Sequence, residues 1–210
     1  MKIRKFRSED RERVRRLACR NARGYPGKNA SWIADILTGY YTDFEPEHLL
    51  IAERGSQMVG YLAGCFDSNR SRWVKAFRVI PRAIGQALIQ GEISYLELRY
   101  FGSLLSAAIH NLAKGFRSLT PKGFPAHFHV SIRDAARGRG VGTMLVEKFL
   151  EDLREEEVEG VYARVREDNE AGLGFFQSLG FRKMRSYRIA LYDGEKVEHS
   201  RSVLLVKKLS

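Results

Sequence analysis

The feature that most constrains this chain is a glycine-rich run between a strand-like segment and an amphipathic helix. Residues 137–143 read Arg-Gly-Arg-Gly-Val-Gly-Thr and follow the strand-like residues 128–132, and a helical pattern begins near Thr143. Glycine lets the backbone approach a ligand closely, and the first N–H groups of a helix have no acceptor within it. The run therefore predicts an anion site, to which Arg137 and Arg139 add charge suited to a pyrophosphate. A plain strand-to-helix loop with two surface arginines would have the same spacing.

The order of the glycines excludes two common nucleotide motifs. A P-loop needs Gly-x-x-x-x-Gly-Lys followed by Ser or Thr, and the sequence contains no such run. A Rossmann site needs Gly-x-Gly-x-x-Gly near the start of a βαβ unit. Here the order is Arg137-x-x-Gly140-x-Gly142, late in the chain. That order resembles the coenzyme A signature of the GNAT superfamily of N-acetyltransferases.

Two further segments resemble the same family, in the expected order. A second strand candidate, residues 160–165, precedes residues 169–181, which begin with Asn, contain a Phe-Phe pair and end in Leu-Gly-Phe. The family usually has an Asn, a small residue, an aromatic pair and Leu-Gly-Phe here. Residues 1–10 resemble its first strand and helix cap. The resemblance covers the chain except for about residues 66–125.

Strand and helix signals alternate, which predicts an α/β (α+β) fold. We expect strands at 2–6, 49–53, 58–64, 184–192 and 203–208, and helices at 8–22, capped by Ser8, and at 31–37, with a break at 24–27 between them. The resemblance implies a mixed, largely antiparallel central sheet flanked by helices. We expect one GNAT-like acyltransferase domain over residues 1–210.

Residues 66–125 depart from the family, whose members often join these two strands by a tight turn. The segment has helical apolar spacing, with nine Lys or Arg against three Asp or Glu. A structureless loop of this length is uncommon in a compact domain, so a helical insertion is predicted before the coenzyme-binding strand. It could be a packed subdomain, a homodimer surface, a lid or a basic acceptor dock.

Bulk properties narrow the partners. The net charge of +11 favours anionic ligands, coenzyme A among them, so nucleic acid is not needed to explain it. Cys19 and Cys65 lie in apolar segments without a metal-ligand cluster, which indicates a reducing cytoplasm. We see no secretory signal, no apolar run of the ~20 residues that a membrane span needs, and no nucleic-acid motif.

The resemblance implies a set of residues that hold acetyl-CoA as co-substrate. Free backbone groups of Val130, Ile132 and Arg133 would pair with the pantetheine arm. Asn169 matches a position that often hydrogen-bonds that arm. Phe176 stands where a tyrosine often protonates the leaving thiolate, so here the thiolate leaves unaided or another group serves, and the ring packs against the arm. The pyrophosphate would lie on Arg137, Gly138, Arg139, Gly140, Val141, Gly142 and Thr143.

His127 and His129 are the candidate catalytic residues. They are two apart on a strand and so project from one face. Histidine titrates near neutrality and can accept the proton of an attacking amine, with His129 favoured because it lies closer to the expected thioester region. A polar pocket of simply hydrogen-bonded histidines is the alternative. A metal site is not favoured, because no third ligand is placed.

The acceptor site is predicted at an aromatic and acidic cluster, Tyr40, Tyr41, Asp43 and Glu45, where carboxylates would attract a cationic amine. Ordinary tyrosine packing beside a solvated loop would give the same pattern. The expected function is acetyl transfer from acetyl-CoA to a primary amine of a small molecule or peptide by direct attack. The alternatives are a non-catalytic coenzyme A or acyl-CoA binding module and, more weakly, a nucleic-acid-associated acetyltransferase that uses the basic insertion.

Overall fold

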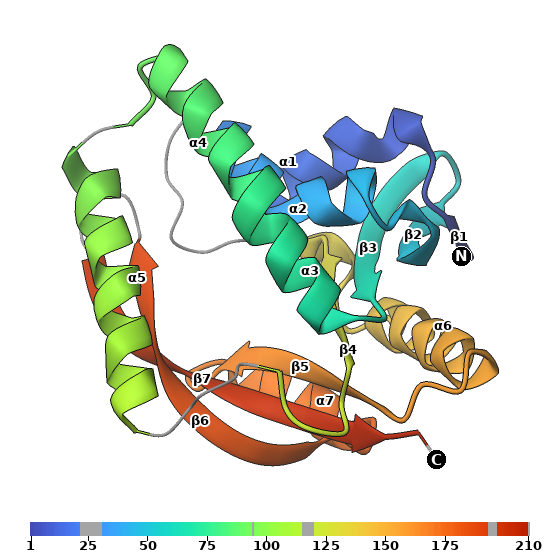
Figure 1. Ribbon diagram of the computed structural model, residues 1–210. Coiled ribbons are helices and arrows are strands. Elements are labelled where there is room, and N and C mark those ends of the chain that lie inside the picture. The colour runs from blue at the N-terminus through green and yellow to red at the C-terminus, as the bar shows by residue number, and fades with distance from the viewer. Residues whose placement is uncertain (22–30, 94, 115–119, 193–196, 210) are drawn as a thin grey trace.

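The described part of the chain is built on a single sheet of seven strands (Figure 1). The computed structural model describes residues 1–21, 31–93, 95–114, 120–192 and 197–209. The strand order is β1-β2-β3-β4-β5-β7-β6, and every neighbouring pair except β4 and β5 is antiparallel. The expected mixed, largely antiparallel sheet is thus confirmed. The strands are β1 Lys2–Lys5, β2 Leu49–Arg54, β3 Gln57–Cys65, β4 Ala126–Ile132, β5 Gly160–Arg166, β6 Arg182–Tyr192 and β7 Val197–Lys208.

The two parallel strands in the middle of the sheet separate almost at once. β4 pairs with β5 only at Ala126 with Val161 and at His127 with Tyr162. On its other side β4 stays paired with β3 as far as Ile132. From Phe128 onward, the edge of β4 that faces β5 therefore has no strand neighbour among the described residues. This opening in the sheet positions the candidate site.

Helices cover both faces of the sheet. α6 (Val141–Glu155) and α7 (Glu170–Ser178) pack on one face, and α1 (Arg11–Asn21) and α2 (Ser31–Asp43) pack on the other. α6 is held by an apolar stripe with helical spacing, in which Leu145, Phe149 and Leu153 are fully buried. Burial of each such side chain contributes about 2 kcal/mol.

The insertion consists of helices, as expected. α3 (Ser68–Val74) begins at Asp67, whose carboxylate accepts hydrogen bonds from two backbone N–H groups of the first turn. A π-helical turn, η3 (Lys75–Val79), connects α3 to α4 (Ile80–Ile89), and η3 and α4 pack against α2. α5 (Tyr95–Ala113) lies apart from them, along β6 and β7 (Figure 1).

Three local predictions were wrong. Ser8 does not cap a helix, because it begins a 3-10 turn (η1, Ser8–Asp10) in which the backbone N–H of Arg7 donates to Asp10 instead. The second helix runs to Asp43, since its last turns bury tyrosines against the sheet. β7 begins at Val197, because its polar first half pairs with β6 in a long hairpin. The predicted break at 24–27 lies outside the described residues.

Asp10 is a buried carboxylate at the centre of an ion-pair cluster. Arg4 donates two hydrogen bonds to it, at 2.6 and 2.9 Å, and also contacts Glu53 at 2.6 Å. Arg13 lies 2.9 Å from Asp10, whose side chain is 0 % exposed. The hydrogen bonds from Arg4 hold the pKa of Asp10 below its usual value. This cluster fastens the N-terminal strand to α1 and β2.

Asp10→Ala is expected to lower the free energy of unfolding by about 3 kcal/mol, because it leaves the half-buried Arg4 short of a partner. Since the folded pKa of Asp10 is depressed, its contribution is present at neutral pH and is lost as pH falls through that folded pKa. Urea unfolding at pH 7 measures the effect, with Glu9→Ala as the exposed control. Equal losses in both variants would contradict a special role for Asp10.

Candidate active site

The glycine-rich run forms a left-handed turn that leads into α6. β4 is followed by a 3-10 turn (η4, Asp134–Ala136), after which Gly138 and Gly140 have φ values of 70° and 75°. L-residues with a side chain rarely adopt this conformation, so the turn needs glycine at both places. α6 then starts at Val141, and its first N–H groups have no acceptor within the helix. The turn thus brings a helix N-terminus directly after the opening between β4 and β5.

The edge of β4 that faces the opening presents backbone groups toward it. The N–H of Arg133 donates to Val59 of β3 at 2.9 Å, and in an antiparallel pair the direction alternates along the strand. The backbone groups of Val130 and Ile132 therefore point away from β3, toward the opening. The expectation that Arg133 has free backbone groups was wrong, because its N–H donates to Val59 and its carbonyl accepts from Ala136. Its side-chain Nε is instead buried without a hydrogen-bond partner among the described residues.

The remaining predicted coenzyme residues lie around this turn. Asn169 caps α7, with its side-chain oxygen accepting from Gly172 N–H at 3.0 Å. The ring of Phe175 packs against Gly142, where an added Cβ would lie 3.2 Å from it.

Phe176 is only 7 % exposed and packs in the core against Phe128. Arg137, Gly138, Arg139 and Gly140 are exposed, and Arg137 pairs with Asp134 at 3.0 Å. An exposed left-handed turn that leads into a helix start, together with an unpaired arginine Nε, fits an elongated anion such as acetyl-CoA.

On the face of β4 that points away from α6, His127 lies in a continuous chain of hydrogen bonds. Its Nε2 is 2.9 Å from the Tyr41 hydroxyl, and its Nδ1 is 2.7 Å from Ser68 Oγ. Lys75 Nζ donates to Tyr41 at 3.0 Å, and Ser68 Oγ donates to the carbonyl of Pro125. Because Ser68 donates its only proton there, it accepts from His127 Nδ1–H, and Nε2 accepts from Tyr41. Both ring nitrogens of His127 are therefore occupied.

His129 projects from the same face, with its ring centroid 5.8 Å from that of His127 and 5.9 Å from that of Tyr41. Its side chain is exposed, and no described residue hydrogen-bonds either ring nitrogen. Desolvation by the surrounding protein atoms lowers the pKa of His129 below its ordinary value, and the positive charges of Lys75 and Arg164 lower it further. His129 is therefore neutral at neutral pH and has a nitrogen lone pair open to a ligand.

Replacing His127 is expected to change how stability depends on pH. Burial, followed by the charge of Lys75, places the pKa of His127 well below 6.5, so below that pH the unfolded chain takes up a proton that the folded chain does not. The stability advantage of wild type over His127→Gln should shrink by up to about 1.4 kcal/mol per pH unit below 6.5. Urea unfolding from pH 7.5 to 5 measures this advantage. An advantage that stays constant with pH would contradict the buried, neutral histidine.

Three further residues join this face that sequence reasoning did not single out. Lys75 lies 4.3 Å from the centroid of the Tyr41 ring, and burial lowers its pKa to about 8. Tyr162 stacks on His127, and the guanidinium of Arg164 lies 5.3 Å from the Tyr162 ring. The period-two alternation of β5 could have placed Tyr162 and Arg164 on one face. No local pattern marked Lys75, although π-helical turns such as the one it begins are frequent at functional sites.

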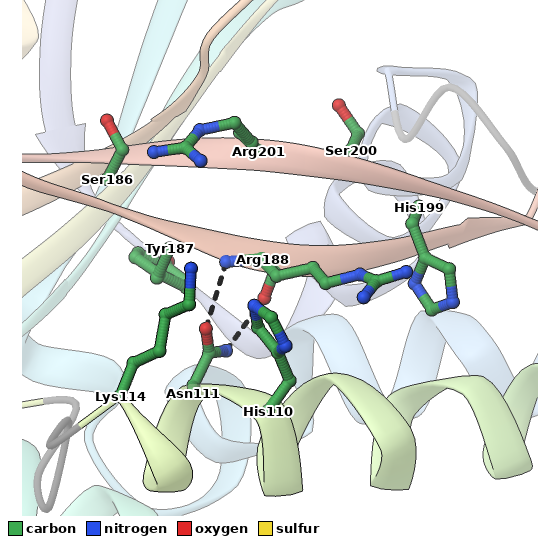
Figure 2. A pocket seen from close by; sticks show the side chains of 9 residues that line it. All are labelled: His110, Asn111, Lys114, Ser186, Tyr187, Arg188, His199, Ser200 and Arg201. Atoms are coloured by element: carbon green, nitrogen blue, oxygen red, sulfur yellow. Dashed lines mark hydrogen bonds between the residues drawn. The ribbon is translucent and has the colours of Figure 1, made fainter.

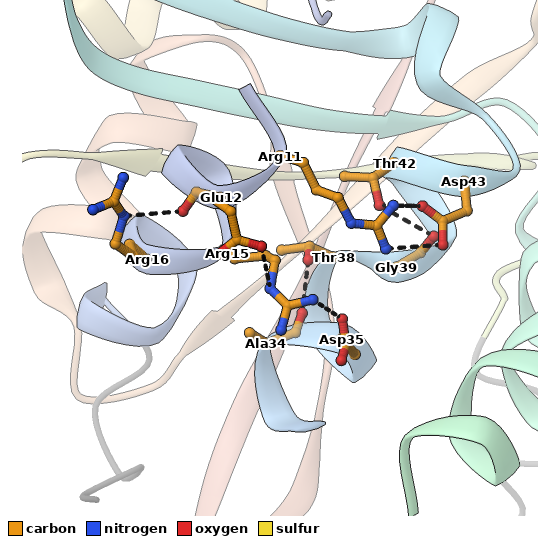
Figure 3. A network of polar contacts seen from close by, with 10 residues as sticks. All are labelled: Arg11, Glu12, Arg15, Arg16, Ala34, Asp35, Thr38, Gly39, Thr42 and Asp43. Atoms are coloured by element: carbon orange, nitrogen blue, oxygen red, sulfur yellow. Dashed lines mark hydrogen bonds and ion pairs between the residues drawn. The ribbon is translucent and has the colours of Figure 1, made fainter. Parts of the chain in front are cut away.

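The structure separates the residues predicted to bind the acceptor. Tyr40 and Tyr41 are almost fully buried, and Tyr41 reaches the histidines. Asp43 accepts from Arg11 and from Thr42, on the side where α1 meets α2 (Figure 3). Glu45 is buried and accepts from the N–H of Phe66 at 2.9 Å. Within the described part of the chain, Tyr41 is the one member of this group that contacts the histidines.

The mixed sheet that opens between two parallel strands, with a left-handed glycine turn at the opening, matches the GNAT fold. Residues 107–181 match the model of the acetyltransferase (GNAT) family. This match runs from the end of α5 through the glycine turn to the start of β6. Over these residues, about a third of the chain, the sequence matches the GNAT acetyltransferase family.

Solved structures match the fold over nearly all of this chain. The protein SsHAT is 23% identical, with a TM-score of 0.70 over 100% of this chain and 98% of its own. The ribosomal-protein-alanine N-acetyltransferase from Brucella melitensis is 17% identical, with a TM-score of 0.59 and 99% of each chain covered. YncA from Salmonella typhimurium, a putative acetyltransferase solved with its cofactor acetyl-CoA, is 13% identical, with a TM-score of 0.58 over 100% of this chain and 94% of its own.

Within the described residues, no helix is both long and apolar enough to cross a membrane.

Proposed function

We propose that this protein transfers the acetyl group of acetyl-CoA to a primary amine of a small molecule or peptide. The observation that carries the proposal is the opening between β4 and β5, with the glycine turn at its end and the exposed His129 on the adjoining strand. Val130 and Ile132 would pair with the pantetheine arm, and residues 137–143 would hold the pyrophosphate with the guanidinium of Arg133 beside them.

In the proposed reaction, the amine nitrogen forms a bond to the acetyl carbon while the carbon–sulfur bond breaks. His129 takes the proton that the nitrogen loses, since its ring nitrogens are open. His127 is a positioning residue, because its hydrogen bonds to Tyr41 and Ser68 occupy both nitrogens. Phe176 has no proton to give, so the thiolate leaves unaided or takes a proton from another group.

The acceptor would enter from the face of the sheet that carries His129, Arg164 and Tyr162, opposite α6 and α7. Two ribosomal-protein-alanine N-acetyltransferases are among the similar structures, so protein N-termini belong beside small amines in any test. We propose a cytoplasmic location on the two free cysteines. The core position of Phe176 favours the second candidate, a coenzyme A binding module without catalysis.

Calorimetric titration with acetyl-CoA, followed by thiol-release assays, tests both candidates. The amine panel should contain peptides with N-terminal alanine, lysine peptides, polyamines and aminoglycosides. Binding with turnover is expected. Binding without turnover on any amine would favour the non-catalytic module, and no binding would overturn the acetyl-CoA assignment.

A further inference from the structure

A separate pocket lies at the outer edge of the sheet, where α5 of the insertion meets β6 and β7 (Figure 2). Its volume is about 370 Å³, within the range of small-molecule sites. It shares no residue with the glycine turn or with the hydrogen-bond chain of His127. The lining residues are His110, Asn111, Lys114, Ser186, Tyr187, Arg188, His199, Ser200 and Arg201.

Asn111 fixes the two walls of this pocket relative to each other. Its side-chain oxygen accepts from the backbone N–H of Arg188 at 3.0 Å, and its side-chain nitrogen donates to the carbonyl of Arg188 at 2.8 Å. The amide thereby pairs with the edge strand in place of another strand. As Figure 2 shows, His110 and Lys114, from the same side of α5, then point toward the strands.

The pocket concentrates positive charge that the described carboxylates leave largely unpaired. Arg201 pairs with Glu167 at 3.0 Å, but no described carboxylate forms an ion pair with Lys114 or with Arg188. Partial desolvation, and then the charges of Lys114, Arg188 and His199, lower the pKa of His110. Apart from Arg201, the basic side chains of the lining thus have no ion pair with a described carboxylate.

We propose that this pocket binds a phosphate monoester carried by a small molecule. Lys114, Arg188 and the imidazoles of His110 and His199 approach from both walls, and Ser186 and Ser200 add hydroxyl groups. A phosphate dianion offers three terminal oxygens to so many donors, whereas a carboxylate offers two. The volume exceeds the need of a phosphate ion, which leaves room for an organic group. The ligand would hold α5 of the insertion against β6 and β7.

The test is calorimetric titration of the full chain with inorganic phosphate and with glucose 6-phosphate, at constant ionic strength. The double variant Lys114→Ala, Arg188→Ala should weaken glucose 6-phosphate binding by about 100-fold, since two charge-assisted hydrogen bonds are lost. Arg137→Ala, in the glycine turn, serves as the control that should retain binding. The backbone contacts of Arg188 to Asn111 survive its replacement by alanine, so the fold is expected to persist, and circular dichroism checks this.

Three outcomes would overturn the proposal. Binding of neither phosphate compound at about 10 mM would do so, since affinity would then be weaker than about 3 kcal/mol. Loss of binding in Arg137→Ala alone would place the phosphate in the glycine turn. Binding of a short single-stranded RNA through Lys114 and Arg188, without glucose 6-phosphate binding, would assign the pocket to a nucleic-acid backbone. None of these results depends on acetyl-CoA turnover, so the proposed function stands or fails separately.

Discussion

Replacing Gly142 by glutamate is expected to weaken acetyl-CoA binding by at least about 100-fold, equivalent to about 2.7 kcal/mol. Gly142 lies in the first turn of α6, where N–H groups and the helix dipole favour an anionic ligand. A carboxylate there would repel the pyrophosphate, and the added Cβ would press on the ring of Phe175 at 3.2 Å. Isothermal titration with acetyl-CoA measures the loss.

The matched control is Gly85→Glu. Gly85 is also a helical glycine, in α4, and an added Cβ there meets nothing within 4 Å. This variant should bind acetyl-CoA as wild type does, and circular dichroism should show that both variants fold. If Gly142→Glu binds as tightly as Gly85→Glu, the pyrophosphate does not lie on this turn.

Replacing His129 by alanine should lower kcat by about 100-fold or more, because a positioned general base contributes at least that much. The affinity for acetyl-CoA should stay unchanged, since His129 lies on the opposite face of β4 from the core around α6. Without this base the amine must lose its proton to water, so the remaining rate should rise with pH. Thiol release with the best acceptor, measured across about pH 6–9, gives kcat and its dependence on pH.

His48→Gln provides the histidine control. His48 stacks on Phe66 at 3.7 Å and lies near Glu45, outside the hydrogen-bond chain of His127. Its replacement should leave the shape of the pH profile unchanged. Full turnover by His129→Ala across neutral pH would show that His129 is not the base. Lys75 would then be the next candidate, because its pKa of about 8 leaves part of its side chain as a neutral amine near neutral pH.

The two histidines illustrate how far sequence reasoning reaches in this site. Their spacing of two on a strand predicts a common face, and their rings indeed lie side by side. Which of them is open is decided by Ser68 and Tyr41, which are 59 and 86 residues away from His127 in the chain. No local pattern contains that information, because it depends on how the insertion and α2 pack against β4.

The sequence by itself determined the strand, glycine turn and helix that would hold a pyrophosphate. These are local properties: left-handed backbone at Gly138 and Gly140, and unpaired N–H groups at the start of α6, follow from neighbouring residues alone. Only the tertiary structure decided that Lys75 approaches Tyr41, that Phe176 lies in the core and that α5 meets the edge of β6. These contacts join segments far apart in the chain, so they depend on the strand order and on side-chain packing rather than on any residue spacing.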